Sequence, residues 1–443
     1  MLVHPMTPET TKPEVEEQQR PFPSKEHAGT IKLFIKKLGP GLVTGASDDD
    51  PSGIGTYSQI GAQFGYGLLW TMLLSYPLMA AIQEISARIG RVTGGGIAAN
   101  LRKSYPKPLL YSVLIVMAIA NVFNLGADIG AMGAALQLLF PGNASIFTMT
   151  CGVASLIAVV FIPYSTYVKY LKWLTVSLFA YVGVVFFVQV PWSAVLHASL
   201  IPHIQLTKAY LTALIAVLGT TISPYLFFWQ ASQEVEEVKN NRGEKSLKRA
   251  PIQAKQQLGR IRIDTYAGMA FSNIVSFFII LTAASTLHVH GITEISSSAQ
   301  AASALQPLAG RFAFVLFVCG IVGTGLLAIP VLAVSAAYGI GEACRWEISL
   351  ERTPARAVRF YAVVSAATLI GLSLNFLRID PVRALFWAAI LNGMVAAPLM
   401  AVIMTMASNQ QVMGKFVIAS YLKGMGWVAT GVMLCVCLGV CFT

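Results

Sequence analysis

The sequence has few charged residues: of 443 residues only 12% are charged, whereas 55% are hydrophobic. The mean hydropathy is +0.65. This composition excludes most soluble proteins, which need a larger share of polar residues on their surface. A bilayer core about 30 Å thick requires about twenty apolar residues for each helical crossing. Because apolar runs of that length recur along the chain, we predict an all-α, polytopic integral membrane protein.

Cysteine and histidine are also scarce, with six of each. The cysteines fall mostly within apolar runs and form no paired Cys-x-x-Cys motif, so we interpret them as packing residues. The histidines lie near the N-terminus or in expected external loops. The net charge of +11 does not indicate a nucleic-acid partner, because the basic residues lie between apolar runs and not in a polar domain.

Eleven apolar stretches are long enough to cross a bilayer. They lie at about 39–61, 64–88, 108–140, 146–163, 166–190, 208–233, 263–287, 310–341, 358–377, 382–407 and 418–441. We predict a transporter domain at 37–407, with spans one to five at about 39–190 and spans six to ten at about 208–407. Residues 408–443 add an eleventh span, and the polar residues 1–36 are expected to form a disordered cytoplasmic tail without a cleavable signal.

The charges of the loops predict the orientation. If the N-terminus is cytoplasmic, all but four of the 31 lysine and arginine residues lie on the cytoplasmic side. The four exceptions are Lys208, Arg311, Arg378 and Arg383. We therefore expect a cytoplasmic N-terminus and an external C-terminus, in a plasma membrane or a bacterial inner membrane.

The first and sixth spans are unusual because polar residues and a proline interrupt each of them, at 47–53 and at 219–225. Each of these spans opens a set of five. An odd number of crossings makes the second set enter the membrane from the opposite side, which gives inverted repeats. Two broken helices at corresponding positions predict a substrate site between them, near the middle of the membrane.

Three consecutive carboxylates, Asp48, Asp49 and Asp50, lie inside the first broken span, and no Lys, Arg or His lies deep inside any span. An ionised carboxylate in the membrane usually faces a partner, water or a cation. The second break offers only hydroxyl and carbonyl oxygens, which favours a hard ion such as Mg²⁺, Ca²⁺ or Mn²⁺; Na⁺ also fits. The alternative is a solvent-exposed Asp turn that caps a helix at Pro51.

Other polar residues within the spans have two interpretations each. Asp128 either guards a water-filled pathway or is a hydrogen-bonded acid of the core. Gln230 either extends the site or packs, and Asn392 either faces the ion pathway or forms an interhelical hydrogen bond. Glu84 and Arg88 have i, i+4 spacing, which predicts a structural ion pair.

Several short motifs follow one another along the chain. They are Gly39-Pro40-Gly41, Asp50-Pro51-Ser52-Gly53, Gly67-Leu68-Leu69-Trp70, Gln83-Glu84-Ile85-Ser86-Ala87-Arg88-Ile89-Gly90, Thr93-Gly94, Asp128, Pro224 and Arg262-Ile263-Asp264-Thr265. In their order and spacing they resemble the NRAMP (natural resistance-associated macrophage protein) family of divalent-metal transporters, over about residues 37–407. The resemblance implies a LeuT-like fold of five-plus-five inverted repeats, with the metal held between spans one and six.

The chain departs from this family at both breaks. Transition-metal transporters of the family typically have Asp-Pro-Gly-Asn and Met-Pro-His, whereas this chain has Asp-Pro-Ser-Gly at 50–53 and Ser-Pro-Tyr at 223–225. Loss of the thioether removes a soft-metal ligand and is similar to the NRAMP-related magnesium transporters. The resemblance implies that Asp48 and Asp49 lie near the ion, with Asp49 accepting from metal-bound water. It implies four metal ligands: Asp50, Gly53, Thr220 and Ser223.

Proton coupling is predicted to be absent or not obligatory. Proton-coupled members of the family have an Asp followed three residues later by Glu in span three, and histidine in span six. Here Asp128 is followed by Ala131, and the histidine positions hold Tyr225 and Gln230. Uptake does not require a proton gradient, because an inside-negative potential of 100 mV favours entry of a divalent ion by about 4.6 kcal/mol.

The leading hypothesis is a transporter, not an enzyme, that carries Mg²⁺ first and Mn²⁺ second by alternating access. We expect it to function as a monomer in the lipid bilayer, with the metal as substrate and no resident cofactor. Three alternatives stay open: a proton-coupled Mn²⁺ or Fe²⁺ symporter, a sodium/amino-acid symporter of the same fold, and an intramembrane aspartyl protease that pairs Asp50 with Asp128.

Overall fold

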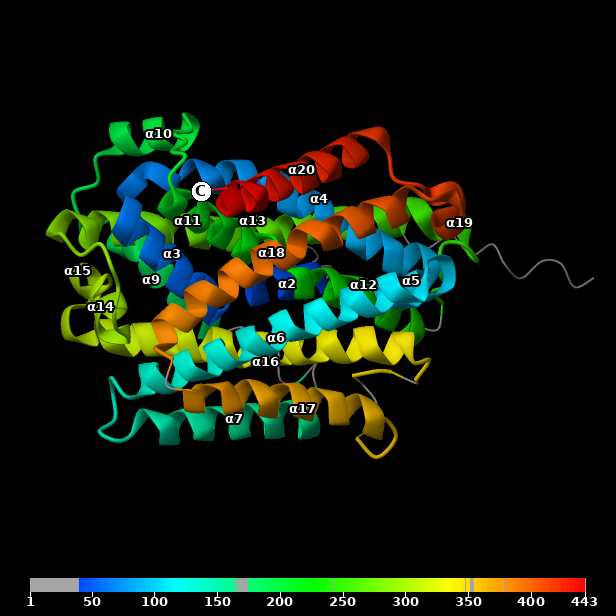
Figure 1. Cartoon of the computed structure of the whole chain (residues 1–443), viewed down its shortest axis with the longest axis horizontal. Coiled ribbons are helices and arrows are strands. Elements are labelled where there is room, and N and C mark those ends of the chain that lie inside the picture. The colour runs from blue at the N-terminus through cyan, green and yellow to red at the C-terminus, as the bar shows by residue number, and fades with distance from the viewer. Residues whose placement is uncertain are drawn as a thin grey trace, which may run out of the picture. The chain divides into compact units, whose positions relative to one another are not determined.

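The computed structural model describes residues 40–163, 166, 174–241, 243–346, 348–350, 354–377 and 379–442. These residues form helices joined by loops and contain no strand (Figure 1). The all-α prediction is therefore confirmed for this part of the chain. The expected tail at 1–36 lies outside the described residues.

The longer helices cross the bundle, and shorter ones connect them. Their bounds are α2 Pro40–Asp48, α3 Pro51–Phe64, α4 Trp70–Thr93, α5 Ile97–Ser104, α6 Lys107–Leu136, α7 Ala144–Phe161, α9 Phe179–Val184, α10 Trp192–Leu200, α11 Lys208–Thr221, α12 Pro224–Asn240, α13 Ala254–Thr286, α14 Ser298–Ser303, α15 Gln306–Ala309, α16 Ala313–Ala343, α17 Val358–Leu374, α18 Pro381–Ser408, α19 Gln410–Met413 and α20 Ser420–Phe442. Short 3-10 turns extend several of them, including Gly65–Leu68 after α3.

Among the described residues, eight helical segments are long and apolar enough to cross a membrane. A ninth is counted if α3 with its 3-10 turn and α4, which are bent by 107° to one another, form one span. The prediction of a polytopic membrane protein is confirmed. The figure of eleven crossings stays a prediction, because a break divides the first span into helices of 9 and 14 residues and because part of the expected span at 166–190 is not described.

Both predicted helix breaks are present. Helix α2 ends at Asp48 and α3 begins at Pro51, with Asp50 as the N-cap residue. Helix α11 ends at Thr221 and α12 begins at Pro224. Proline lacks the N–H that would continue a preceding helix but suits the first helical position, so each proline ends one helix and starts the next.

Helix α13 packs closely along both halves of the first broken span. A Cβ added to Gly45 of α2 would lie 2.1 Å from the carbonyl oxygen of Gly268, and one added to Gly61 of α3 would lie 2.4 Å from that of Ile280. Only glycine permits backbones to approach this closely. The two halves of the first span therefore pack against one uninterrupted helix.

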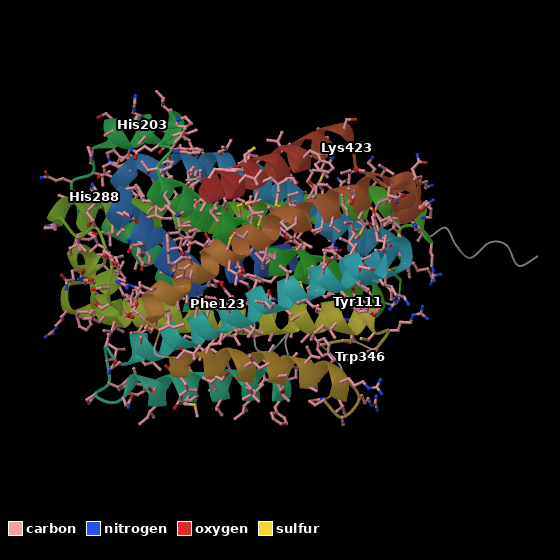
Figure 2. The ribbon with its side chains drawn as sticks, viewed as in Figure 1. Tyr111, Phe123, His203, His288, Trp346 and Lys423 are labelled. Carbon is pink, nitrogen blue, oxygen red and sulfur yellow. The ribbon has the colours of Figure 1, made fainter. Side chains whose placement is uncertain are left out.

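Other long helices of the bundle also lie side by side in pairs. Helix α6 runs beside α16, and α7 and α17 lie side by side at one edge of the bundle (Figure 1). Large apolar side chains on α7, among them Ile157 and Phe161, are exposed, as expected of a surface that faces lipid. His203 and His288 lie at one end of the helices and Lys423 at the other (Figure 2), in agreement with the predicted alternation of loops.

Charged side chains tie the helices together at the Lys423 end. Arg260 of α13 pairs with Glu234 and Glu237 of α12, at 2.6 and 2.9 Å. Glu84 and Arg88 of α4 form the predicted structural ion pair, at 2.5 Å.

A buried carboxylate on α16 joins α5 and α12 at this end. Glu342 of α16 accepts hydrogen bonds from the N–H groups of Gly96 and Ala99 at the start of α5, both at 3.0 Å, and from the Ser232 hydroxyl of α12 at 3.4 Å. These contacts hold α12 against α16.

Candidate metal-binding site

The two broken helices meet at Tyr225, in the first turn of α12. Its hydroxyl lies 3.3 Å from the carbonyl oxygen of Ser47 and 3.3 Å from Oδ2 of Asp50. The start of α12 therefore lies beside the break between α2 and α3, as the hypothesis of a shared site requires. Asp50, Ser47 and Tyr225 are all buried.

Asp50 caps α3. Its Oδ1 accepts from the Gly53 N–H at 2.7 Å and from the Ser52 hydroxyl at 2.8 Å. The capping role that was weighed as an alternative is thus present, but the aspartate is not solvent-exposed, since only 2% of its surface is accessible. Capping engages one carboxylate oxygen and leaves Oδ2 directed toward α6 and α12.

Asn124 of α6 connects three of the predicted residues and was not identified from the sequence. Its Nδ2 donates to Oδ2 of Asp50 at 3.0 Å and to Oδ2 of Asp128 at 3.2 Å. Its Oδ1 accepts from Nδ2 of Asn392 at 3.1 Å. The interhelical hydrogen bond weighed for Asn392 is therefore present, and it leads through one amide to Asp50. Asn124 and Asp128 are four residues apart and therefore lie on the same face of α6. This spacing is the sequence signal that could have identified Asn124.

The second break contributes oxygen atoms. The Ser223 hydroxyl lies within hydrogen-bonding distance of the carbonyl oxygens of Gly219, at 3.0 Å, and Thr220, at 2.8 Å, and the Thr220 hydroxyl lies 2.9 Å from that of Tyr57. At the first break, Gly53 has no side chain; a Cβ there would lie 3.4 Å from Cε2 of Tyr57, which is ordinary van der Waals contact. The donors at both breaks are thus small and oxygen-based.

Asp48, Asp49 and Gln230 have other partners. Asp48 and Asp49 contact Ser272 of α13, and Oε1 of Gln230 accepts from the Thr44 hydroxyl. Among the described residues, no three His, Cys, Asp or Glu side chains are grouped so that they could hold a metal. A metal at Asp50 would therefore be held by one carboxylate and neutral oxygen atoms, not by the three consecutive aspartates together.

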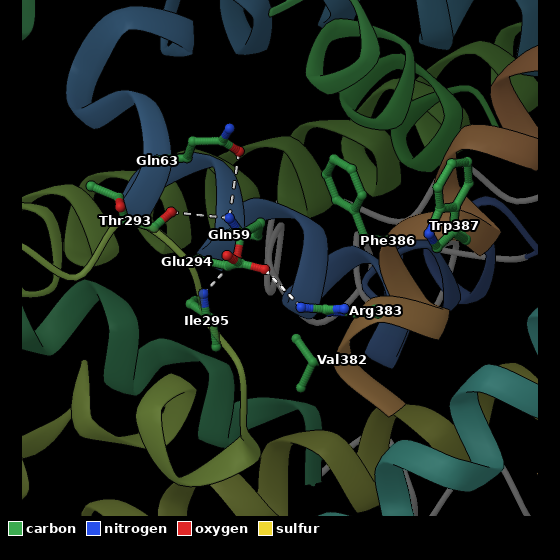
Figure 3. A pocket seen from close by; sticks show the side chains of 9 residues that line it. All are labelled: Gln59, Gln63, Thr293, Glu294, Ile295, Val382, Arg383, Phe386 and Trp387. Carbon is green, nitrogen blue, oxygen red and sulfur yellow. Dashed lines mark hydrogen bonds and ion pairs between the residues drawn. The ribbon is translucent and has the colours of Figure 1, made fainter. Parts of the chain in front are cut away.

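A cavity of about 420 Å³ opens at the His288 end of the helices (Figure 3). Gln59 of α3 binds the loop that follows α13, through Thr293 O at 3.2 Å and the Ile295 N–H at 2.8 Å. Across the cavity, Arg383 of α18 pairs with Glu294 of the same loop at 3.1 Å. The cavity is lined by α3, α18 and this loop, and its lining includes Gln59 and Gln63 of the first span but not Asp50.

Residues 41–443 match the natural resistance-associated macrophage protein-like family. The chain belongs to this family. The resemblance inferred from the order and spacing of the short motifs is therefore confirmed, and the match extends through the eleventh expected span.

Curated relatives include the divalent metal cation transporter MntH of Klebsiella pneumoniae, which is 26% identical over 426 residues, covering 93% of this chain and 94% of the relative. The MntH protein of Pectobacterium carotovorum is 23% identical over 411 residues, covering 89% and 91% of the two chains. Both alignments are nearly full-length.

Solved structures with a similar fold include a variant of the Eremococcus coleocola manganese transporter, with a TM-score of 0.69 at 15% identity over 93% of this chain and 88% of that one. The nucleobase-cation-symport-1 transporter MHP1 has a TM-score of 0.54 at 12% identity, over 91% and 92% of the two chains. At these identities the likeness concerns the fold, and it confirms the predicted LeuT-like architecture.

Proposed function

We propose that this family member transports divalent metal cations across a membrane, with Mg²⁺ as the first substrate and Mn²⁺ as the second. The observation that carries the proposal is the buried Asp50 carboxylate at the junction of the two broken helices, where Oδ2 is contacted only by the Asn124 amide and the Tyr225 hydroxyl among the hydrogen bonds of the described residues. The names of the MntH relatives support a divalent metal as cargo.

The donor types support the choice of Mg²⁺. In the proposed site Asp50 supplies a carboxylate, Thr220 supplies its backbone carbonyl and Ser223 supplies its hydroxyl. Gly53 stands at the position of the family's asparagine ligand, and its N–H binds Asp50. Hard oxygen donors suit Mg²⁺, which keeps several of its water molecules, whereas thioether and imidazole favour softer ions. The absence of side-chain atoms at Gly53 leaves room for an ion that is partly hydrated.

The proposed mechanism is alternating access without obligatory proton symport. The ion enters through the cavity beside α3 and α18 and reaches Asp50 when α3 moves. Release at the other end requires α12 to part from α16, where Ser232 contacts Glu342. Tyr225 and Gln230 occupy the positions at which proton-coupled relatives carry histidine, so the membrane potential drives uptake.

A proton-coupled symporter is the second candidate, because one observation favours it. Asp128 is buried and shares the Asn124 amide with Asp50, so the two carboxylates are linked through a single side chain. An acid in this position could exchange a proton when metal reaches Asp50. Recording lumenal pH during uptake separates the two candidates.

The test is metal uptake into proteoliposomes under an inside-negative potential, with Mg²⁺, Mn²⁺ and Ca²⁺ compared. We expect Asp50→Asn to reduce uptake by about tenfold or more, because asparagine retains the helix cap but removes the charge. The matched control is Asp380→Asn, since Asp380 also caps a helix that begins with proline but is only partly buried. Unchanged uptake by Asp50→Asn would reject the proposed role, and stoichiometric movement of protons would reject the uncoupled mechanism.

A further inference from the structure

The three consecutive aspartates face two different sides of the broken helix. Asp50 is directed toward α6 and α12, whereas Asp48 and Asp49 are directed toward α13. The Ser272 hydroxyl lies 2.8 Å from Oδ2 of Asp48 and 3.0 Å from Oδ1 of Asp49, and the Ser276 hydroxyl lies 3.3 Å from the same oxygen of Asp49. One serine thus contacts both carboxylates, so the two acidic groups converge on one point of α13.

Each of these carboxylates retains an oxygen atom without a partner. Among the described residues, Oδ1 of Asp48 and Oδ2 of Asp49 have no hydrogen-bond partner, although only 1% of the surface of each aspartate is accessible. Among the described residues, neither aspartate forms an ion pair with Lys, Arg or His. Two adjacent buried carboxylates repel each other and lose hydration, so a cation is needed to stabilise the charged forms.

We propose that Asp48, Asp49, Ser272 and Ser276 form a second binding site for a divalent cation, separate from the one at Asp50. Two carboxylates balance the charge of one divalent ion, and all four side chains offer oxygen atoms. A serine that donates its hydrogen to one carboxylate still has oxygen lone pairs for a metal. The inference rests on the proposed function only in taking the ion to be the transported metal.

The second site has a consequence for transport. An ion bound between α2 and α13 lies next to the break that holds the first ion, and two divalent ions at neighbouring sites repel each other. Occupation of one site therefore weakens binding at the other. Because of this repulsion, an ion can leave a pathway whose single sites bind it tightly.

The experiment counts metal ions bound to the purified full-length protein in detergent, by equilibrium dialysis with Mn²⁺ and then by displacement with Mg²⁺. We expect two ions per chain for the wild type, one for the Asp48→Asn/Asp49→Asn double variant and one for Asp50→Asn. Ser272→Ala and Ser276→Ala, which remove neutral groups, should each weaken the second ion by about tenfold. The control is Ser86→Ala, because the one hydrogen bond of the buried Ser86 hydroxyl within the described part of the chain is to the Ile82 carbonyl of its own helix, at 2.9 Å.

The outcomes separate this inference from the proposed function. A single ion that is lost in Asp50→Asn but kept by the double variant and by both serine variants overturns the second site and leaves the first intact. A single ion that is lost in the double variant but kept by Asp50→Asn supports the site on α13 and rejects the role given to Asp50. If the double variant does not fold, unchanged binding of both ions in Ser272→Ala and Ser276→Ala overturns the inference.

Discussion

The hydroxyl of Tyr225 lies 3.3 Å from Oδ2 of Asp50 and 3.3 Å from the carbonyl oxygen of Ser47. It therefore links the first turn of α12 to both sides of the break in the other helix. A hydroxyl has one hydrogen and can donate to only one of these acceptors at a time. We expect it to donate to Ser47 when a metal engages Asp50, so that loading of the ion changes how the two helices are joined.

This link predicts the effect of Tyr225→Phe. Phenylalanine keeps the buried ring but removes the donor, and loss of a partner that orients a ligand typically costs about tenfold or more in metal affinity. We expect Mn²⁺ binding, measured by equilibrium dialysis, to weaken by about tenfold. Tyr210→Phe is the control, because the Tyr210 hydroxyl accepts from Trp70 and not from either break. Equal affinities in the two variants would contradict the prediction.

Asn124→Ala should impair uptake by about tenfold or more, because it leaves the buried carboxylates of Asp50 and Asp128 without their shared donor. The measurement is the initial rate of Mg²⁺ uptake into proteoliposomes. Asn121→Ala is the matched control on the same helix, since Asn121 donates to Leu332 and Ser335 of α16. It should lower thermal stability and leave metal affinity unchanged; comparable loss of uptake in both variants would mean that Asn124 is structural.

Selectivity should change when softer ligands are restored. The double variant Gly53→Asn/Ser223→Met introduces an amide and a thioether at the proposed site, and thioether favours transition metals over Mg²⁺. A side chain can start at position 53, because its Cβ would make no contact shorter than 3.4 Å. We expect the ratio of Mn²⁺ to Mg²⁺ uptake to rise by about tenfold. An unchanged ratio with retained uptake would place the selective contacts elsewhere.

Arg260→Met should destabilise the protein. Arg260, whose side chain is 21% exposed, pairs with the fully buried Glu234 at 2.6 Å, and leaving a buried carboxylate without its partner costs up to about 3–5 kcal/mol. We expect a lower Tm in detergent, recovered in part by adding Glu234→Gln. The exposed pair of Arg383 and Glu294 provides the control: Arg383→Ala should cost about 1 kcal/mol or less. An equal loss of Tm in both single variants would show that burial of the pair is not decisive.

The positions of the helix breaks could be predicted from the sequence because their cause is local. Pro51 and Pro224 each interrupt an apolar run together with neighbouring polar residues, and proline supplies no N–H to continue the preceding helix. Proline alone does not decide the break, since Pro77, Pro330 and Pro398 lie inside α4, α16 and α18. The ion pair of Glu84 and Arg88 was predictable for the same reason, since both residues lie on one helix.

The directions of the three aspartates could not be predicted. Asp49 and Asp50 lie between two helices, where no helical period relates one side chain to the next. Asp50 contacts Asn124 of α6, whereas Asp49 contacts Ser272 of α13. Both helices are distant in the sequence, so only the packed structure shows which aspartate faces which helix. The contact of Asn392 with Asn124 was one of two open interpretations for the same reason.

Helix α13 supports both halves of the broken first helix. At Gly45 and Gly61, on either side of the break, the two halves of that helix pack directly against the backbone of α13 at Gly268 and Ile280. A half-helix packed this closely cannot move independently of α13. During a transport cycle, the half-helix that moves must either carry α13 with it or slide along α13 at the glycine contacts. A larger residue at position 45 or 61 would therefore block this movement before it changed the ligands of the ion.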